Sequence, residues 1–282
     1  MANPSFRNNP LGFLGATVTY FWLPVVLVIV WWFASARSQS FFLPPLSDIV
    51  GVLWTDLLNG TLARETLFSL RNVLFGLFLS LSLGLGFGLL IGHNKRLRIA
   101  LWPFLAFLRA VPGVAVVPVV LVAMGVGPGP QIFIIVFGCT WPILLNTIDG
   151  VRGIRESITD TARAYRLKGW LYVRTVLIPA ALPQTMAGIR ISLSVSLTLM
   201  VVSEFSAGNA GLGHYILRGQ EAFRPSQVWA GTIYIGIVGY LLNVIFVFVE
   251  RRLLGWYFGI PRRTPRHRPA PKAAGGPLKP EA

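Results

Sequence analysis

Charged side chains are scarce in this sequence. Only 12% of its 282 residues are charged and 54% are hydrophobic, whereas an ordinary soluble domain carries roughly 25% charged residues. Several uncharged runs exceed the length of about 18 residues that spans a bilayer. A soluble protein of this size cannot bury so much apolar surface, and within lipid the backbone hydrogen bonds must be satisfied inside helices. The composition therefore predicts an all-α integral membrane protein.

Groups that carry chemistry are also few. Cys139 is the one cysteine, so the chain can form no intramolecular disulfide. His93, His214 and His267 are scattered without the spacing of metal ligands, so we predict no metal site. The sequence has neither a nucleophile paired with a base nor a Gly-x-x-x-x-Gly-Lys-Ser/Thr loop that cradles nucleotide phosphates. We therefore predict no catalytic residue and no cofactor bound by this chain.

The apolar runs predict six membrane spans. A turn rich in Gly and Pro at 125–130 separates the third span from the fourth. Val111-Pro112-Gly113 predicts a break within the third span. From Ser80 to Gly92 a small residue recurs at every fourth position, which lets another helix approach closely. The six spans cover about 11–36, 72–92, 99–124, 131–148, 184–203 and 228–249.

Basic residues set the expected orientation. The 25 Lys and Arg residues outnumber the 10 Asp and Glu residues and give a net charge of +15. Most lie between spans two and three, between spans four and five, and after span six, and positive charge is retained on the cytoplasmic side. We therefore predict a cytoplasmic N-terminus at 1–10, a membrane domain at 11–256, and a disordered basic cytoplasmic tail at 257–282. The charge thus marks topology and contact with the lipid membrane, and no nucleic-acid partner is expected.

The external segment after the first span predicts a short surface helix. Ile49, Val52 and Leu53 fall at helical spacing. Ser47 or Asp48 is expected to cap the N-terminus of this helix.

The cytoplasmic segment 149–183 has about 35 residues, which is too long for a simple connection between spans. Ile154, Ile158, Thr161 or Ala162, and Tyr165 predict the apolar face of a helix that Gly169 ends. A second short stretch then leads to Pro179 and into span five. Such a helix either rests on lipid headgroups or docks a soluble partner.

This segment also carries the parts of a known motif. Asp160-Thr161-Ala162-Arg163 and Val176-Leu177-Ile178-Pro179 resemble the cytoplasmic loop of bacterial ATP-binding-cassette (ABC) importer permeases. The usual form of that loop is Glu-Ala-Ala, three residues, Gly, nine residues, and Ile-x-Leu-Pro. Asp160 stands for the usual Glu, Thr161 for the first Ala, and Arg166 for the Gly.

Further stretches narrow the resemblance to the nitrate, sulfonate, taurine and bicarbonate branch of these permeases, over residues 40–256. They include Ser69-Leu70-Arg71, Arg109-Ala110-Val111-Pro112, Ser203-Glu204 and Gly211-Leu212-Gly213. The branch implies a small oxyanion or an organosulfonate as the solute. The alternatives are a pyrimidine precursor or an aromatic acid carried by the same machinery, or an ion-coupled secondary transporter.

The resemblance implies a multi-pass permease of the type I ABC importer fold in the bacterial cytoplasmic (inner) membrane, which works by alternating access. It implies a homodimer, two separate ABC ATPase subunits that bind ATP and Mg, and a periplasmic or lipoprotein solute-binding protein. The chain itself would be a transport subunit and not an enzyme. Its loop would couple to the ATPase through Asp160, Thr161, Ala162, Arg163, Arg166, Gly169 and Pro179.

Polar residues within the spans are candidates for the substrate pathway, because polar groups are costly against lipid. Arg109 is the one ionisable residue well inside the third span, and the fifth span contributes Ser192, Ser196, Thr198 and, at its end, Glu204. Two alternatives stay open. Arg109 pairs with an acidic group such as Glu204 or caps helix carbonyls at the break, and the hydroxyls bond back to carbonyls of their own helix or serve as small packing residues.

Overall fold

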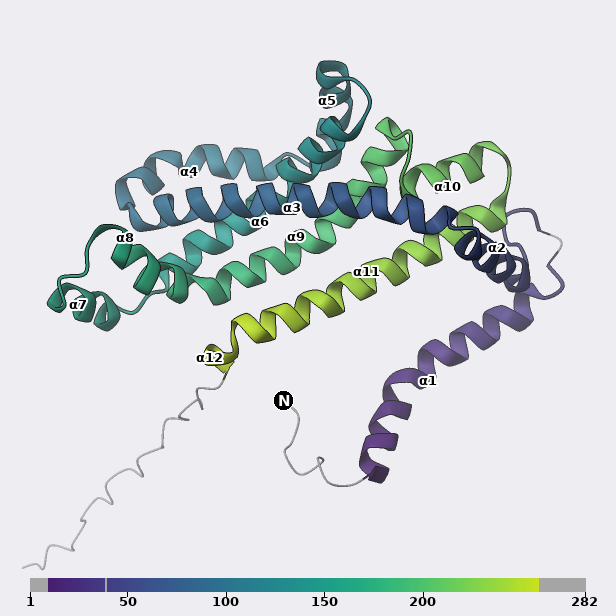
Figure 1. The fold of residues 1–282 in the computed structure, drawn as a ribbon, viewed down its shortest axis with the longest axis horizontal. Coiled ribbons are helices and arrows are strands. Elements are labelled where there is room, and N and C mark those ends of the chain that lie inside the picture. Colours follow the sequence, from purple (N-terminus) through teal and green to yellow (C-terminus); the bar gives the residue numbers. More distant parts are fainter. Residues whose placement is uncertain (1–9, 39, 259–282) are drawn as a thin grey trace, which may run out of the picture.

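The computed structural model describes residues 10–38 and 40–258, and every regular element in that part is a helix (Figure 1). The all-α prediction is therefore confirmed. The predicted N-terminal segment up to residue 9 and the basic tail beyond residue 258 lie outside the described residues. α12 (Gly255–Phe258) carries the helical part as far as residue 258, slightly beyond the predicted start of the tail.

Four helices in the described part are long and apolar enough to cross a membrane. They are α3 (Thr61–His93), α6 (Pro128–Arg152), α11 (Pro225–Leu253), and the continuous stretch Gly169–Ser206, which contains most of α9 (Ile178–Ala207). A bent pair of helices makes a fifth candidate. α1 (Pro10–Ser35) contributes the shorter apolar stretch Trp22–Ser35. The count of six spans and the side of each terminus stay predictions.

The bent pair lies at the predicted break. α4 (Lys95–Ala110) meets η2 (Gly113–Val116) and α5 (Val117–Met124) at 82°. Pro112 has no N–H and disfavours helical backbone at the residue before it. Val111 accordingly has φ −72° and ψ 117°, which ends α4. The break at Val111-Pro112-Gly113 is therefore confirmed.

The core is built from α3, α6 and α9, with α6 packed against both of the others (Figure 1). Small residues of α3 allow the close approach. A Cβ atom on Gly84 would lie 2.8 Å from the Cβ of Ile143, and one on Gly88 would lie 2.6 Å from the Cβ of Thr147. Since real Cβ contacts this short do not occur, the stripe predicted on α3 is confirmed as a packing surface.

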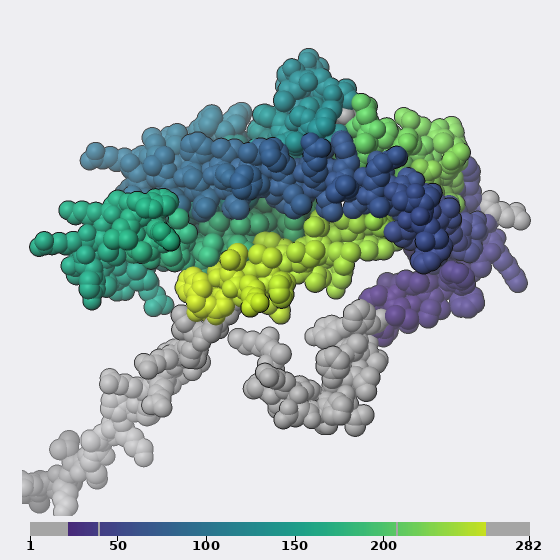
Figure 2. All heavy atoms as spheres, in the orientation of Figure 1, coloured from purple at the N-terminus to yellow at the C-terminus, as the bar shows by residue number. Residues whose placement is uncertain are grey.

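The connecting helices gather at opposite ends of this core (Figure 1). α7 (Glu156–Ala164), α8 (Gly169–Tyr172) and the π-helical turn η3 (Val173–Leu177) lie at one end, and α2 (Leu46–Leu58) and α10 (Leu212–Glu221) lie at the other. α5 projects from the body of the molecule (Figure 2). Its Val119 and Val122 are 68% and 91% exposed.

The predicted cap of the surface helix is wrong. α2 begins at Leu46, directly after Pro45, and no side chain of its own caps it. Ser47 and Asp48 already lie inside the first turn, where the Ser47 hydroxyl donates to Asp48 Oδ1 at 3.2 Å. Ser35, at the end of α1, accepts the N–H of Leu46 at 3.1 Å instead. The cap therefore comes from a residue distant in sequence.

Candidate functional site

A cavity of about 410 Å³ lies where α4 ends, between that break and the helices α6 and α9. We call it the Arg109 cavity. Arg109 and Thr198 contribute a guanidinium and a hydroxyl, Trp141 carries an indole N–H without a hydrogen-bond partner among the described residues, and none of the lining residues is acidic. The full lining consists of Arg109, Val111, Pro112, Gly113, Val114, Gly138, Trp141, Pro142, Leu145, Val195, Thr198 and Leu199.

Arg109 owes its position to the break in the third predicted span. It lies in the last turn of α4, where a cation is favoured by the partial negative charge of the helix C-terminus. Within the described residues its guanidinium has no ion pair and no hydrogen bond. Both predicted alternatives, a pair with Glu204 and a cap on helix carbonyls, are therefore wrong for the described part of the chain. The charge of Arg109 is left free beside the cavity.

The hydroxyls predicted along α9 separate into two groups. Thr198 lines the Arg109 cavity, and its Oγ1 lies at the long distance of 3.4 Å from the carbonyl oxygen of Ser194. Ser192 and Ser196 are fully buried. They donate to the carbonyls of Cys139 and Leu193, each at 2.8 Å. Thr198 and Arg109 thus line the same cavity, whereas Ser192 and Ser196 make hydrogen bonds within the packed helices.

Glu204 takes part in a different arrangement, at the start of α10. The first N–H groups of a helix have no partner within the helix. Here three side chains of α3 and α9 accept them: Glu65 Oε2 accepts from Gly211 at 2.6 Å, Ser69 Oγ from Leu212 at 2.8 Å, and Glu204 Oε2 from Gly213 at 2.7 Å. Carboxylates are also favoured there by the partial positive charge of the helix N-terminus. We call Glu65, Ser69 and Glu204 the α10 cap.

The α10 cap is buried and internally bonded. Glu65 and Glu204 are 2% and 1% exposed. The Ser69 hydroxyl donates to Glu204 Oε1 at 2.7 Å, and Arg218 Nη2 lies 3.0 Å from Glu65 Oε1. Gly211 has φ +113°, and a Cβ there would lie 2.3 Å from the Glu204 carboxyl carbon. Only glycine therefore fits at this position.

Three stretches singled out from the sequence, around Ser69, Glu204 and Gly211, meet in the α10 cap. The bonded partners are distant in sequence, since 143 positions separate Ser69 from Leu212 and 146 separate Glu65 from Gly211. Glu65 was not predicted. The available signal was its spacing of four from Ser69, which puts both side chains on one face of α3.

A further, partly buried contact holds α10 to α2. The Tyr215 hydroxyl donates to Asp56 Oδ2 at 2.6 Å. Burial raises the pKa of this hydroxyl, and the bond to the Asp56 carboxylate raises the pKa further. Tyr215 therefore stays a neutral donor at any physiological pH.

The predicted coupling residues lie on an exposed turn at the other end of the molecule. Arg163 Nη1 lies 3.2 Å from Asp160 Oδ1, with both side chains exposed. Ala162 is buried at 3% exposure, whereas Ile158 and Tyr165 are 43% and 77% exposed. The predicted continuous apolar face is therefore wrong, because α7 ends at Ala164, before Tyr165 can join it.

α7 ends in a left-handed turn at Arg166, which has φ 52°. The N–H of Arg166 donates to Arg163 O and that of Leu167 to Ala162 O, both at 2.9 Å. This pair of bonds is the Schellman motif, whose left-handed position usually holds glycine. Gly169 follows with φ 56° and begins α8, so the prediction that Gly169 ends the preceding helix is wrong, because the Schellman turn at Arg166 already ends α7 at Ala164. Pro179 lies in the first turn of α9.

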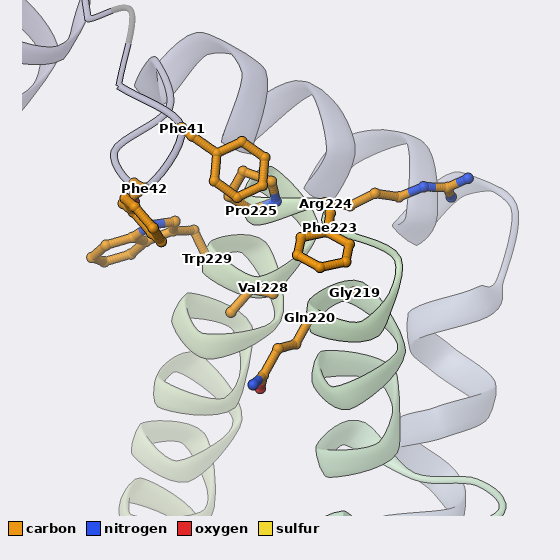
Figure 3. Close-up of a pocket in the computed structure, with 9 residues that line it drawn as sticks. All are labelled: Phe41, Phe42, Gly219, Gln220, Phe223, Arg224, Pro225, Val228 and Trp229. Atoms are coloured by element: carbon orange, nitrogen blue, oxygen red, sulfur yellow. The ribbon is translucent and has the colours of Figure 1, made fainter.

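A second hollow, of about 250 Å³, lies at the end of the molecule that carries α10 (Figure 3). Phe41, Phe42, Phe223 and Trp229 surround it, and the Trp229 indole N–H donates to the Phe42 carbonyl at 3.0 Å. The side chain of Arg224 points away from it (Figure 3). Aromatic side chains at the end of a span are typical of the bilayer interface. This hollow therefore lacks the charge that would select a solute.

Comparison with known proteins gives matches over most of the chain. Residues 84–255 match the family model described as binding-protein-dependent transport system inner membrane component. A Bacillus subtilis protein named as an aliphatic sulfonates transport permease is 31% identical over 83% of this chain and 86% of its own length. A bicarbonate transport system permease of Synechococcus elongatus is 33% identical over 79% of this chain and 78% of its own length. A nitrate import permease of Synechocystis is 28% identical over 88% of this chain and 94% of its own length.

Solved structures share the fold. The methionine ABC transporter MetNI in an inward-facing conformation contains a chain with a TM-score of 0.59 and 20% identity, matched over 68% of this chain and 95% of that one. A bacterial ABC transporter involved in alginate import contains a chain with a TM-score of 0.55 and 13% identity, matched over 85% of this chain and 99% of that chain. These matches confirm the predicted type I ABC importer permease fold.

Proposed function

We propose that this chain imports a small anion. The proposal starts from its family: the chain belongs to the binding-protein-dependent transport system inner membrane components, and is thus a permease subunit of an ABC importer in the inner membrane. We propose that it imports the anion as a homodimer with two separate ATPase subunits and a solute-binding protein. ATP and Mg would bind only to the ATPases, since the sequence contains no phosphate-binding loop.

The Arg109 cavity carries the proposal for the solute. Its one charged side chain is an unpaired guanidinium and its lining holds no carboxylate, so it favours an anion over a cation or a neutral solute. The names of the three relatives, for sulfonates, bicarbonate and nitrate, agree with an anionic solute. We assign Arg109 and Thr198 to the substrate pathway. We do not assign Ser192, Ser196 or Glu204 to it, since each is bonded elsewhere.

The turn between α7 and α8 is proposed to dock on the ATPase. Tyr165 and Trp170 are 77% and 71% exposed there, beside the exposed pair of Asp160 and Arg163. Exposed aromatic side chains next to charges are typical of an interface with a soluble partner. The proposed coupling residues are Asp160, Thr161, Ala162, Arg163, Arg166, Gly169 and Pro179.

The first test is of coupling. Asp160→Lys and Arg163→Glu should each lower at least tenfold the amount of ATPase that copurifies with the tagged permease from its own host membranes. Asp48→Lys, at an exposed acid of α2 on the opposite end, is the matched control and should leave copurification unchanged. Full copurification in both loop variants would contradict the assignment.

The second test is of the solute. In proteoliposomes that hold the complete transporter with excess binding protein, ATP should drive uptake of radiolabelled anions. Arg109→Gln should lower that uptake at least tenfold, since a hydrogen bond to a charged group contributes about 1.5–3 kcal/mol. Arg224→Gln, an exposed arginine outside the cavity, should not change it. Uptake driven by an ion gradient without ATP would instead favour a secondary transporter.

A further inference from the structure

The lining of the Arg109 cavity is mostly apolar. Arg109 supplies a positive charge and Thr198 a hydroxyl, while Trp141, Leu145 and Val195 line the remainder together with other apolar groups. The indole N–H of Trp141 is a further polar group, which is buried and has no hydrogen-bond partner in the described part of the chain. One cation without an acid among the lining residues is suited to a solute with a single negative charge. The apolar walls put a second condition on that solute.

The volume of the cavity exceeds what a small inorganic ion needs. An apolar cavity of about 150 Å³ is enough to bind benzene. The Arg109 cavity measures about 410 Å³. It therefore has room for an aromatic ring or a short alkyl chain in addition to a sulfonate or carboxylate group.

Hydration separates organic from inorganic anions in such a cavity. Nitrate or bicarbonate must give up water around all its oxygens, and the guanidinium and one hydroxyl replace only part of those hydrogen bonds. Oxygens that face apolar walls without a partner are costly. An organic anion turns its oxygens to Arg109 and its apolar part to the walls, where burial is favourable.

On the premise of the proposed function, we propose that the Arg109 cavity is a binding site for an organic monoanion within the membrane. The sulfonate or carboxylate group lies on the Arg109 guanidinium, and the hydrocarbon part lies against Trp141, Leu145 and Val195. The permease thereby disfavours inorganic oxyanions, independently of the selectivity of the solute-binding protein.

The test measures binding without the solute-binding protein, whose own selectivity would mask the effect. The permease with its ATPase subunits is placed in nanodiscs, and tritiated benzenesulfonate is bound in the nucleotide-free and vanadate-trapped states. Competitors are nitrate, methanesulfonate and butanesulfonate. We expect nitrate to bind at least tenfold more weakly than benzenesulfonate, and affinity to rise up to about fourfold with each added methylene.

Two isosteric substitutions, one turn apart on α9, distinguish the contribution of the apolar lining to binding from that of the Thr198 hydroxyl. Val195→Thr adds a hydroxyl to the wall and should weaken benzenesulfonate binding about fivefold with no loss for nitrate. Thr198→Val removes the hydroxyl and should weaken nitrate with no loss for butanesulfonate. Arg109→Gln should abolish binding of all these anions, whereas Arg224→Gln should leave every affinity unchanged.

Equal affinities for nitrate and benzenesulfonate, no binding in either state, or no response to Val195→Thr would each overturn this inference. ATP-driven anion uptake by the complete transporter would be untouched by those results. Conversely, absence of any ATP-driven uptake would overturn the proposed function, whatever the nanodiscs bind. The two failures are therefore distinguishable.

Discussion

At the scale of single residues, ionisable groups in the apolar helices meet two different conditions. Glu65 and Glu204 are buried but accept hydrogen bonds from the start of α10, so their charge is compensated by N–H groups and, for Glu65, by Arg218. Arg109 has no partner among the described residues and faces a cavity. A compensated charge serves the architecture, whereas the uncompensated charge of Arg109, which is exposed beside the cavity, is available to a solute.

Gly211→Ala tests the α10 cap at this scale. The new Cβ would clash with the Glu204 carboxylate, and the alanine would have to adopt the positive φ that only glycine adopts readily. We therefore expect a loss of about 2 kcal/mol or more in the free energy of unfolding. Thermal unfolding of the purified transporter in detergent, followed by tryptophan fluorescence, measures this. Gly51→Ala in α2 is the matched control, since a Cβ there meets nothing within 4 Å and alanine favours the helix. Equal melting temperatures for the two variants would contradict the role given to Gly211.

At the scale of the elements, the end of α7 departs most from the motif that it resembles. Arg166 replaces the usual Gly and yet adopts the left-handed backbone that glycine favours. For an L-residue with a Cβ, the left-handed conformation is less stable than the right-handed one by about 1–2 kcal/mol. The loop geometry is therefore kept at a cost in stability, and the guanidinium is left on the face proposed to dock on the ATPase.

Arg166→Gly should recover part of this cost. We expect a gain of about 0.5–1 kcal/mol in the local stability of the turn, seen as slower hydrogen exchange of the amides of residues 160–167 by mass spectrometry. Tyr165→Gly, one position earlier at an ordinary φ of −81°, should instead speed exchange. If Arg166→Gly also speeds exchange, the strain argument is wrong.

At the scale of the whole molecule, a tightly packed core of α3, α6 and α9 carries more loosely attached helices. In an apolar stretch of 18 residues in α11, only 6% is buried inside the molecule. Gln227, near its start, donates to the Tyr215 carbonyl at 3.2 Å, and near its end Glu250 pairs with Arg190 of α9. α11 is thus tied to its neighbours by polar contacts near both ends, while lipid is expected to cover much of its length.

Glu250→Gln should therefore loosen one end of α11 and little else. We expect faster hydrogen exchange at residues 245–253 and no change in α3, with a cost on the order of 1 kcal/mol because Arg190 is half exposed and solvent screens the pair. Arg251→Gln, an exposed neighbour, is the control. Unchanged exchange at the end of α11 would contradict this view of its attachment.

Features that depend on local sequence were predictable. Pro112 determines the bend after α4, and the small residues of α3 determine its contact with α6. The α10 cap and the cap of α2 by Ser35 were not predictable, since their partners are distant in sequence and any Ser or Glu fits a local rule equally well. The same limit explains why Ser192 and Ser196 looked like pathway residues: burial between helices cannot be read from one helix alone.

The α10 cap also bears on how the chain is made. Ribosomes deliver α3 first, α9 more than a hundred residues later, and α10 last of the three. Until Gly211, Leu212 and Gly213 have been synthesised, Glu65 and Glu204 lack the amide donors that compensate their burial. During insertion these acids must stay hydrated or protonated, so the ends of α3 and α9 that carry them reach their final, charge-compensated packing only after the polypeptide has grown past residue 213.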